Sequence, residues 1–598
     1  MSKSLKEIYK ELPLVSWDTE TFGNIKKVSV WHPSIKLAYI SKATRAKSQV
    51  WHCPDPRKSP YRRLLREQLG DPNTIKVFWN ASFDIPVLLK AGFPIRGHIL
   101  DAMLLAQLVF PEESSHSLKH FSKRYLDDSY LEEDEIKRYM RKNKCDYGSV
   151  PPHVMEPYAA KDAENTLTFA EGLIQKLDDF DMWDTWALEV ATLSACLRMT
   201  SKGVPVDAEA VYVLREAAIK DARNLKTQIV KATDNPEFNP NSNPQVGKLL
   251  FSEDPNARRT TTGQYKVDNL ALLTHGSKLA LAILRLRSTA KAIGTYYDTL
   301  YDLPLKGRLH CNLNQGHAIT GRFSSSKPNL QNQPRPSKAL IGRIRECYTA
   351  SSPAHRLVFI DFDQIEIRIL AHYSKEPHMI EAILAGEDAH GVTCKRMFEL
   401  DESDKQWGFY RYIAKRLNFA TVYGTGGEKF SHTVLEDTQG RVNISIERAR
   451  DYINKWWRAH PNVKALQSTL TDQVARDRSI RCRTGRRIPV PVSKSYVALN
   501  YLIQGTAADE MKRAIVGADQ ILTRFYPPEE AALLLTVHDE LIFDVKKRAK
   551  GVIKLLLEVM ENREDYIVPL TCSVEVGYRW GTKRAYEVTR DSKLKCDL

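Results

Sequence analysis

Short apolar runs that end directly in acidic residues occur in two distant parts of this sequence. Leu14–Trp17 is followed by Asp18 and Glu20, and Leu357–Ile360 is followed by Asp361. Residues i and i+2 of a strand face the same way, so we expect Asp18 and Glu20 on one side of a strand. A carboxylate at a buried strand end is costly unless a cation compensates its charge. These runs therefore favour metal sites at strand ends; an exposed acidic surface is the alternative for any single D-x-E triplet.

The length of the chain predicts more than one domain. Its 598 residues exceed the roughly 250–300 at which a single core stops growing. At first the β-rich runs Leu14–Trp17, Val28–Trp31 and Ile75–Trp79 alternate with helical patterns, which predicts an α/β domain with a mixed sheet. After a change of composition near residue 185, long helical stretches follow. From about residue 356 the pattern predicts a strand, a group of helices and a pair of strands around residue 538. We therefore expect a multidomain chain, α/β at residues 1–185 and α+β at residues 186–598.

The composition indicates a folded, basic protein. Lysine and arginine number 88 and aspartate and glutamate 73, so the net charge is +15; this suggests a polyanionic partner, with plain solubility as the alternative. No apolar stretch approaches the roughly 20 residues of a membrane-spanning helix, and the N-terminal segment has no secretory signal pattern. Nine cysteines without a C-x-x-C pair fit reduced thiols, so we expect a cytoplasmic setting.

Two further acids of the first part follow regular elements. Asp84 comes after an apolar strand, and Asp162 lies one turn after Tyr158 on a predicted helix. Together with Asp18 and Glu20, these acids come from separate elements, which is what two-metal hydrolysis of a phosphodiester requires. Such a cluster is too repulsive to persist without cations.

A second group of acids is predicted where two late strands meet. Asp539 and Glu540 lie between the apolar runs 533–537 and 541–543, as expected for a hairpin with acids at its bend. Asp361 is far from them in the sequence, so only the fold could unite the three. Because carboxylates at buried strand ends need a compensating cation, a metal site is favoured here as well.

Side chains between these acids recur at intervals of four residues. Arg411, Lys415, Phe419 and Tyr423 would form one gently winding stripe on a helix, since each step turns it by about 400°. Two cations and two rings on one face suit a triphosphate and a stacked base. The alternative is a basic solvated face whose rings anchor the core. Farther on, the strongly basic run 476–487 is either a solvated turn or a contact to nucleic-acid phosphates.

These motifs resemble, in order along the chain, the signatures of family A DNA polymerases, those similar to bacterial DNA polymerase I. The first set is similar to the DEDD-type 3′–5′ proofreading exonuclease domain of such enzymes, and consists of Asp18, Glu20, Asp84, Asp162 and Tyr158, with Asp101 as a secondary match. The polymerase signatures are matched by segments 320–332, 361–368, 411–424, 504–509 and 538–540.

The resemblance implies a fold and a division of the chain. A ribonuclease-H-like exonuclease domain would occupy residues 1–185 and a right-hand polymerase domain residues 186–598. Within the latter, the thumb is expected at about 190–305, the palm at about 306–375 and 500–598, and the fingers at about 376–495. We also expect no 5′ nuclease domain, and a phage-type origin.

The resemblance further implies two metal sites. Asp361 and Asp539 would bind two Mg²⁺ in the polymerase site, with Glu540 as an accessory acid. Two more Mg²⁺ would lie in the exonuclease site, held by Asp18, Glu20, Asp84 and Asp162, while Tyr158 helps to orient the attacking water. Mn²⁺ is expected to substitute for Mg²⁺.

Other residues would bind nucleotide and DNA. The nucleotide-binding set implied by the resemblance is Gln364, Glu366, His390, Arg411, Lys415, Phe419 and Tyr423. In that set Lys415 would protonate pyrophosphate, Glu366 would exclude a ribose 2′-hydroxyl, and Phe419, which is not a Tyr, predicts poor use of dideoxynucleotides. The DNA-binding set is Arg322, Asn329, Gln331, Asn332, Arg486, Arg487, Asn500, Gln504 and His538, whose minor-groove members would check the shape of a base pair without selecting sequence.

The implied function is DNA-directed DNA polymerase activity with 3′–5′ proofreading in DNA replication. Primer-template DNA and deoxynucleoside triphosphates would be the partners of a monomer without membrane attachment, and a replisome or processivity factor stays open. Two residues depart from the family pattern. Asp363 stands where the family usually has a Ser, which puts the metal affinity in doubt. Tyr496 stands where many relatives have an Arg, which puts a DNA contact in doubt. The alternatives are a nuclease whose second half only grips DNA, a non-catalytic scaffold, and an RNA polymerase of related architecture.

Overall fold

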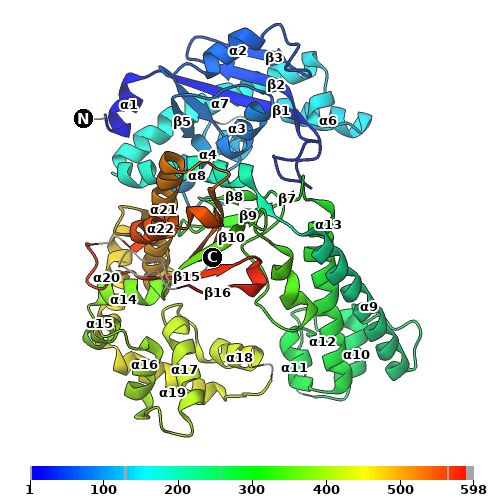
Figure 1. Ribbon diagram of the computed structural model, residues 1–598, viewed down its shortest axis with the longest axis vertical. Helices are drawn as coiled ribbons and strands as arrows, with labels where there is room; N and C mark the ends of the chain where they lie inside the picture. The colour runs from blue at the N-terminus through cyan, green and yellow to red at the C-terminus, as the bar shows by residue number, and fades with distance from the viewer. Residues whose placement is uncertain (1–2, 127–130, 256, 439, 562–563, 587–598) are drawn as a thin grey trace.

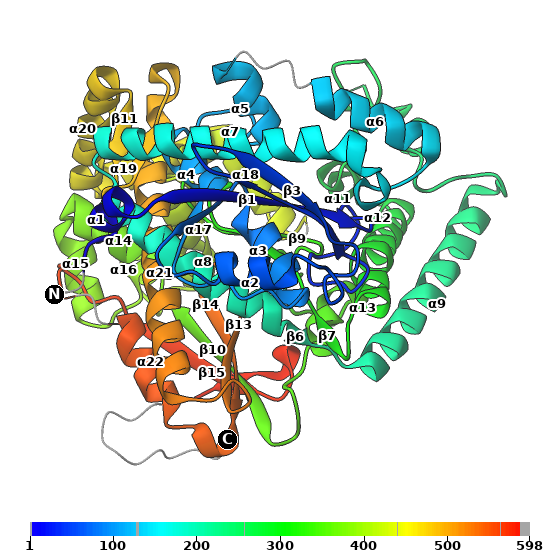
Figure 2. The same ribbon diagram turned by 90° about the horizontal axis from the view of Figure 1, so that it is seen from above.

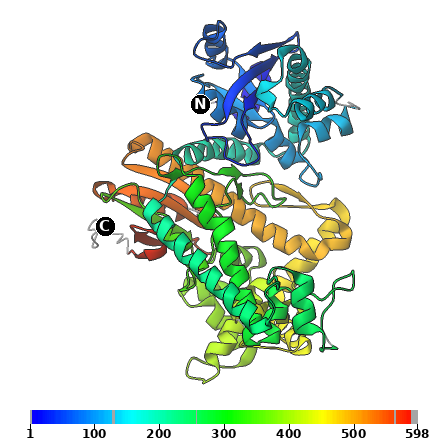
Figure 3. The same cartoon turned by 90° about the vertical axis from the view of Figure 1, so that its right-hand side faces the viewer.

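The computed structural model describes residues 3–126, 131–255, 257–438, 440–561 and 564–586. Figure 1 shows an N-terminal domain at the top, a central sheet below it, and two helical arms that extend downward on either side. The N-terminal domain also stands apart from the rest in the side view of Figure 3. No helix within the described ranges is long and apolar enough to cross a membrane.

The N-terminal domain is a five-stranded mixed sheet with helices on both faces. Its elements are α1 (Leu5–Glu11), β1 (Leu14–Phe22), β2 (Lys36–Ala43), β3 (Ser48–His52), α2 (Arg62–Leu69), β4 (Ile75–Phe78), α3 (Ala81–Lys90), β5 (His98–Asp101), α4 (Ala102–Val109), α5 (Leu118–Tyr125), α6 (Leu131–Asn143), η1 (Tyr147–Ser149) and α7 (Pro152–Asp179). The strand order is β3-β2-β1-β4-β5, with β1 antiparallel to β2 and parallel to β4. Successive residues enter two separate cores, as Tyr39 and Ile40 do. The long α7 packs across β1 and β2 (Figure 2).

The strand predicted at Val28–Trp31 is wrong, because this segment forms turns between β1 and β2. Its polar groups are bound by side chains and not by a neighbouring strand: the Lys90 ammonium donates to the Val30 carbonyl oxygen, and the Ser29 hydroxyl donates to Asn312 Oδ1 at 3.0 Å. Tertiary contacts with α3 and with the second part of the chain therefore override the local β propensity.

A long helix, α8 (Trp183–Lys202), connects the N-terminal domain to the first arm. This arm consists of α9 (Ala208–Thr233), α10 (Asn243–Phe251), α11 (Asn269–His275), α12 (Lys278–Lys291), the π-helix η2 (Ala292–Tyr297) and α13 (Asp298–Asp302). It has an apolar core of its own that includes Leu225, Ile229 and Ile283. The boundary that we predict near residue 185 lies in the first turn of α8 and stays a prediction.

The central sheet is five-stranded and antiparallel, in the order β13-β14-β10-β15-β16. Its strands and the helices packed on it are β10 (His355–Phe362), α14 (Ile365–Ser374), α21 (Ala498–Phe525), β13 (Ala531–Val537), β14 (Glu540–Lys546), η5 (Lys547–Ala549), α22 (Val552–Glu561), β15 (Cys572–Gly577), η6 (Trp580–Thr582) and β16 (Arg584–Ala585). Because β10 pairs with β14, the C-terminal end of β10 lies beside the bend of the β13–β14 hairpin, at one end of the strands of the sheet.

The second arm is helical and lies across from the first (Figure 1). It comprises α15 (Pro377–Leu384), α16 (Ala389–Phe398), α17 (Trp407–Ala420), α18 (Gly427–Asp437), α19 (Ile446–Ala459) and α20 (Pro461–Asp477). The hairpin β11 (Ser479–Arg481) and β12 (Arg487–Pro489) and the turn η4 (Val492–Val497) lead back to α21. Short elements between α13 and β10 are β7 (Arg308–Leu309), β8 (Asn312–Asn314), β9 (Ser324–Ser326) and η3 (Leu340–Cys347), while β6 (Val204–Pro205) follows α8.

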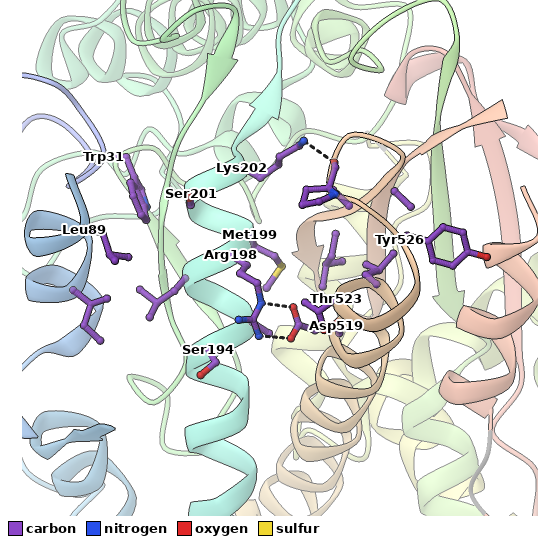
Figure 4. A pocket seen from close by; sticks show the side chains of 18 of the residues that line it. Trp31, Leu89, Ser194, Arg198, Met199, Ser201, Lys202, Asp519, Thr523 and Tyr526 are labelled. Atoms are coloured by element: carbon purple, nitrogen blue, oxygen red, sulfur yellow. Dashed lines mark hydrogen bonds and ion pairs between the residues drawn. The ribbon is translucent and has the colours of Figure 1, made fainter. Parts of the chain in front are cut away.

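A cavity of about 790 Å³ lies between the N-terminal domain and the central part. In Figure 4, Trp31 and Leu89 of the N-terminal domain lie on one side of α8, and α21 lies on the other. Arg198 of α8 and Asp519 of α21 form an ion pair, in which Nε donates to Oδ1 at 2.7 Å. This ion pair therefore holds the connecting helix α8 against α21, which packs on the central sheet.

Candidate active sites

Three acids of the N-terminal domain meet at one point. Asp18 and Glu20 come from β1 and Asp162 from α7, and one carboxylate oxygen of each lies within 4.8 Å of the others. Tyr158 is buried one helical turn before Asp162. The alternation of the strand and the spacing of the helix thus bring these side chains together, although they are spread over more than 140 positions of the sequence.

The surroundings of these carboxyls oppose their ionisation. Burial and the nearby Asp84 raise the pKa of Asp18 to about 8, and burial with the charges of Asp18 and Asp162 raises the pKa of Glu20 well above its ordinary value. Among the described residues, Oδ2 of Asp18 is buried without a hydrogen-bond partner. An unpartnered oxygen in a set of carboxylates fits a hard divalent cation such as Mg²⁺, so the residues present suit a metal site.

Asp84 and Asp101 lie beside this group and are held by neighbouring donors. Asp84 Oδ1 accepts from the amide of Thr19 at 3.0 Å and from its hydroxyl at 2.6 Å. Asp101 caps α4 and accepts from the amides of Leu104 and Ala81, both at 2.9 Å. Burial raises the pKa of each to about 7. Asp84 is therefore fixed against β1 next to the three acids, whereas Asp101 serves as a helix cap.

Asp361 and Asp539 lie side by side where β10 ends next to the bend of the β13–β14 hairpin. The Phe362 amide donates to the Asp539 carbonyl oxygen at 3.1 Å, and Asp361 is opposite Glu540 in the register of β10 and β14. His538 turns the hairpin in the left-handed region, with a φ of 54°. Burial and the charges of Glu540 and Asp539 raise the pKa of Asp361 to about 7, and burial raises that of Asp539 to about 6. This donor set also suits a divalent cation.

A cavity of about 560 Å³ opens beside Asp361 and is lined also by Asp363, Gln364 and Arg411. Arg411 projects from α17, and its Nε donates to Asp388 Oδ2 at 2.6 Å. Lys415 is exposed one turn farther along the helix. Two of the predicted nucleotide-binding residues therefore share a cavity with a predicted metal ligand.

The rest of the predicted stripe is partly buried. The ring of Phe419 lies 5.8 Å from that of His390, measured between centroids. Burial lowers the pKa of His390 to about 4, so this side chain is uncharged at neutral pH. The helix α17 ends before Tyr423, whose hydroxyl donates to Glu366 Oε2 at 2.6 Å. Arg322 forms an ion pair with the other oxygen of Glu366.

The expectation that Arg486 contacts template phosphates is wrong, because its guanidinium is engaged inside the protein. Its side chain is 5% exposed, its Nε donates to Asp509 Oδ1 at 2.9 Å, and it also pairs with Glu189. Arg487 is half-buried, with its guanidinium 4.7 Å above the ring centre of Phe180. Within the same basic run, the arginines at 476 and 478 are exposed.

Other predicted DNA-binding residues surround the acidic end of the sheet. Asn329 Oδ1 accepts from the amides of Gln331 and Asn332, both at 3.1 Å, so these three shape one loop. Gln331 is buried and donates to a carbonyl oxygen of β13 at 3.3 Å. Asn500 and Gln504 lie one turn apart on α21. A role in DNA binding stays a prediction for all of them.

The sequence analysis did not predict a role for two charged residues next to the sites, Asp388 and Lys583. Asp388 pairs with Arg411, and Lys583 Nζ lies 2.5 Å from Glu540 Oε1. Their partners are 23 and 43 residues away, so no local pattern marks either contact.

Comparisons with known proteins agree with this geometry. Residues 209–582 match the family model for DNA polymerase family A, and residues 1–178 match the one for 3′–5′ exonucleases. DNA polymerase I of Pseudomonas aeruginosa is 29% identical over 540 residues, which cover 87% of this chain and 58% of that protein. DNA polymerase I of Chloroflexus aurantiacus is 30% identical over 539 residues, or 86% of this chain and 55% of that one. The chain thus spans little more than half the length of these relatives.

A solved structure gives the same fold. The POL domain of Pol1 from M. smegmatis, in complex with DNA primer-template and dNTP, matches with a TM-score of 0.79 and 24% identity over 97% of this chain and 99% of that one. The predicted fold class is therefore confirmed: an exonuclease domain precedes a right-hand polymerase domain. The predicted bounds of palm, fingers and thumb stay predictions. Because the matching family model covers more than half of the sequence, the chain belongs to DNA polymerase family A.

Proposed function

We propose that this chain is a DNA-directed DNA polymerase that extends a primer in DNA replication and removes mispaired 3′ ends with a second site. The observation that carries the proposal is the presence of two separate acidic sites in one chain. One joins β1 to α7, and the other lies where β10 meets the β13–β14 hairpin. A nuclease alone would need one such site, and a binding scaffold would need neither.

At the polymerase site, Asp361 and Asp539 would hold two Mg²⁺, with Mn²⁺ as a substitute. When bound, such ions lower the pKa of the primer 3′-hydroxyl and neutralise charge on the departing pyrophosphate. Arg411 and Lys415 would bind the triphosphate in the cavity beside Asp361, and Lys415 would give pyrophosphate a proton. Since Arg411 is paired with Asp388, nucleotide binding competes with this ion pair.

Selection of the substrate would depend on Glu366. Tyr423 and Arg322 hold its two carboxylate oxygens, and its charge is close enough to raise the pKa of Asp539. A carboxylate fixed at this place would exclude a ribose 2′-hydroxyl, so the substrates are deoxynucleoside triphosphates and the polymer is DNA. Arg322, Gln504 and their neighbours would read the minor groove of the terminal base pair, where acceptors occur in every pair.

At the exonuclease site, Asp18, Glu20, Asp84 and Asp162 would hold two divalent ions that activate water and stabilise the leaving oxygen. Tyr158 would orient the water from its place on α7. A mispaired end that slows extension would fray and move to this site. A replisome or processivity factor, the monomeric state and the cytoplasmic setting stay predictions from the resemblance.

Single substitutions separate the two sites. Asp539→Asn should abolish extension of a labelled primer and leave 3′–5′ excision, whereas Asp18→Asn should do the reverse. Both isosteric changes remove one charge, and Glu558→Gln on the exposed face of α22 is the matched control that should keep both activities. Gel assays with deoxy- or ribonucleotides, in Mg²⁺ or chelator, give the measurement. Loss of both activities in either variant would refute the assignment of two sites, and equal use of ribonucleotides would favour an RNA polymerase.

A further inference from the structure

We propose that Lys583 is a positioning residue of the polymerase site, which binds Glu540 and keeps it away from the metal ions. This inference rests on the proposed two-metal site. Lys583 Nζ lies 2.5 Å from Glu540 Oε1 and 2.6 Å from Glu575 Oε2. Glu540 in turn lies opposite Asp361 across the β10–β14 pair. The ammonium group is therefore one side chain removed from a predicted metal ligand.

The segment that carries Lys583 is fixed to the central sheet at both ends. On one side Trp580 is 1% exposed and packs on Tyr348 and Phe359, with ring centroids 5.4 and 6.2 Å apart. On the other side β16 pairs with β15, and the Tyr586 amide donates to a carbonyl oxygen of β15 at 2.8 Å. Lys583 thus reaches Glu540 from the residue between η6 and β16, and the flanking elements on both sides hold it against the sheet.

The location of the ammonium favours positioning over binding of substrate. The Lys583 side chain is 20% exposed, lies 4.7 Å from the ring centre of Phe359, and has two carboxylate partners. A lysine that binds a phosphate directly would present its ammonium group to the solvent side of the site. The Lys583 ammonium instead compensates the charge of Glu540, which the sequence analysis assigned to the polymerase site as an accessory acid.

The consequence concerns charge. Asp361, Asp539 and Glu540 bring three carboxylates to one end of the sheet, and Lys583 compensates one of them. Of these three, Asp361 and Asp539 then remain for the ions. Lys583→Met would release Glu540 and add one negative charge to the site, so divalent ions should bind about fivefold to tenfold more tightly. Lys583→Arg should stay close to the native affinity, because the cation is kept.

The test uses the full chain with Asp18→Asn and Asp162→Asn, so that binding reports the polymerase site. Mn²⁺ is titrated by electron paramagnetic resonance in a complex with primer-template DNA that ends in a dideoxynucleotide and with the incoming deoxynucleotide. Lys547→Met is the control and should leave the affinity unchanged, because Lys547 is exposed in η5, just after the far end of β14. The Mg²⁺ concentration for half-maximal extension, measured without the exonuclease substitutions, should fall in parallel.

A double substitution gives the decisive comparison. If Lys583 acts through Glu540, then Lys583→Met combined with Glu540→Gln should return the Mn²⁺ affinity to within about twofold of native. Tighter binding that persists in the double variant would overturn the proposal, as would an unchanged or weaker affinity in Lys583→Met, or a raised KM for deoxynucleotide at unchanged Mn²⁺ affinity. Lys583→Gln replaces Lys583→Met if melting shows that the latter does not fold. Absence of any Mn²⁺ binding that Asp539→Asn removes would instead refute the proposed function.

Discussion

The carboxyls of Asp18, Glu20 and Asp84 couple the stability of the exonuclease domain to pH. Their pKa values lie above the ordinary range, with Asp18 at about 8 and Asp84 at about 7. Between about pH 4 and 8 the folded chain therefore binds more protons than the unfolded chain, so stability falls as pH rises. We expect the melting temperature in chelator to fall over this interval, and Mg²⁺ to raise it more at pH 8 than at pH 5, because ionised carboxylates bind the ion.

The double variant Asp18→Asn with Glu20→Gln is the control for this prediction. It removes two of the titrating groups, so the melting temperature in chelator should depend less on pH and respond less to Mg²⁺. A native melting temperature that is flat from pH 5 to 8 would contradict the assignment of raised pKa values.

The residues of the two sites differ in how far the sequence could predict them. Asp18, Glu20 and Asp361 could be predicted from local alternation and from their place at the ends of apolar runs, although Asp361 itself is exposed. Arg486 could not be placed, because its partner Glu189 lies 297 residues earlier and nothing local distinguishes a buried arginine from a solvated one. Lys583 could not be predicted for the same reason, because its contact with Glu540 joins residues 43 positions apart.

At the scale of elements, Asp388 links α16 to α17. Its oxygens accept from the amides of His390 at 3.3 Å and Gly391 at 2.8 Å, which caps α16, and one of them also accepts from Arg411. Asp388→Asn keeps a good cap but removes the charge that, under the proposed function, competes with a triphosphate for Arg411. We expect the KM for deoxynucleotide to fall by about threefold to tenfold. Steady-state extension measures it.

Two further variants control for this result. Arg411→Ala should raise the KM for deoxynucleotide, and Asp388→Ala should lose about 1 kcal/mol of stability because the cap is gone. A KM that rises in Asp388→Asn would show that the ion pair holds Arg411 in place for the nucleotide and does not compete with it.

The elements themselves were predictable where local pattern and tertiary packing agree. The runs that became β1, β4, β10 and the β13–β14 hairpin alternate or are continuously apolar and end at polar residues. Val28–Trp31 has the same local character yet forms turns, because Lys90 and Asn312 bind its polar groups. Contacts of that kind join distant segments and leave no periodicity in the sequence.

At the scale of the molecule, Glu189 ties α8 to the polymerase domain through buried charges. Its carboxylate pairs with Lys512 at 2.5 Å and with Arg486, and the Gln315 amide donates to it at 2.6 Å. Burial opposes its ionisation, yet Lys512 and Arg486 lower the pKa of Glu189 below its ordinary value. Glu189→Ala leaves buried cations short of a partner, so we expect the polymerase domain to lose about 3–5 kcal/mol in its free energy of unfolding. Urea denaturation measures this loss.

The exposed ion pair between Arg45 and Glu171 is the matched control. Their Nε and Oε1 atoms are 2.7 Å apart, but the arginine side chain is 84% exposed. Glu171→Ala should therefore cost less than about 1 kcal/mol. Equal losses in the two alanine variants would mean that the buried cluster is not what holds α8 in place.

The long sequence separation within the buried cluster of Glu189, Arg486 and Lys512 affects when the cluster can form on the nascent chain. Arg486 and Lys512 follow Glu189 by 297 and 323 residues. At roughly 5–20 residues per second, a ribosome needs about 15 to 60 s to deliver them. The exonuclease domain has been synthesised in full by then. Until Arg486 and Lys512 follow, the Glu189 carboxylate on α8 stays hydrated. The contact between α8 and the polymerase domain thus forms only near the end of translation, after the exonuclease domain has had time to fold.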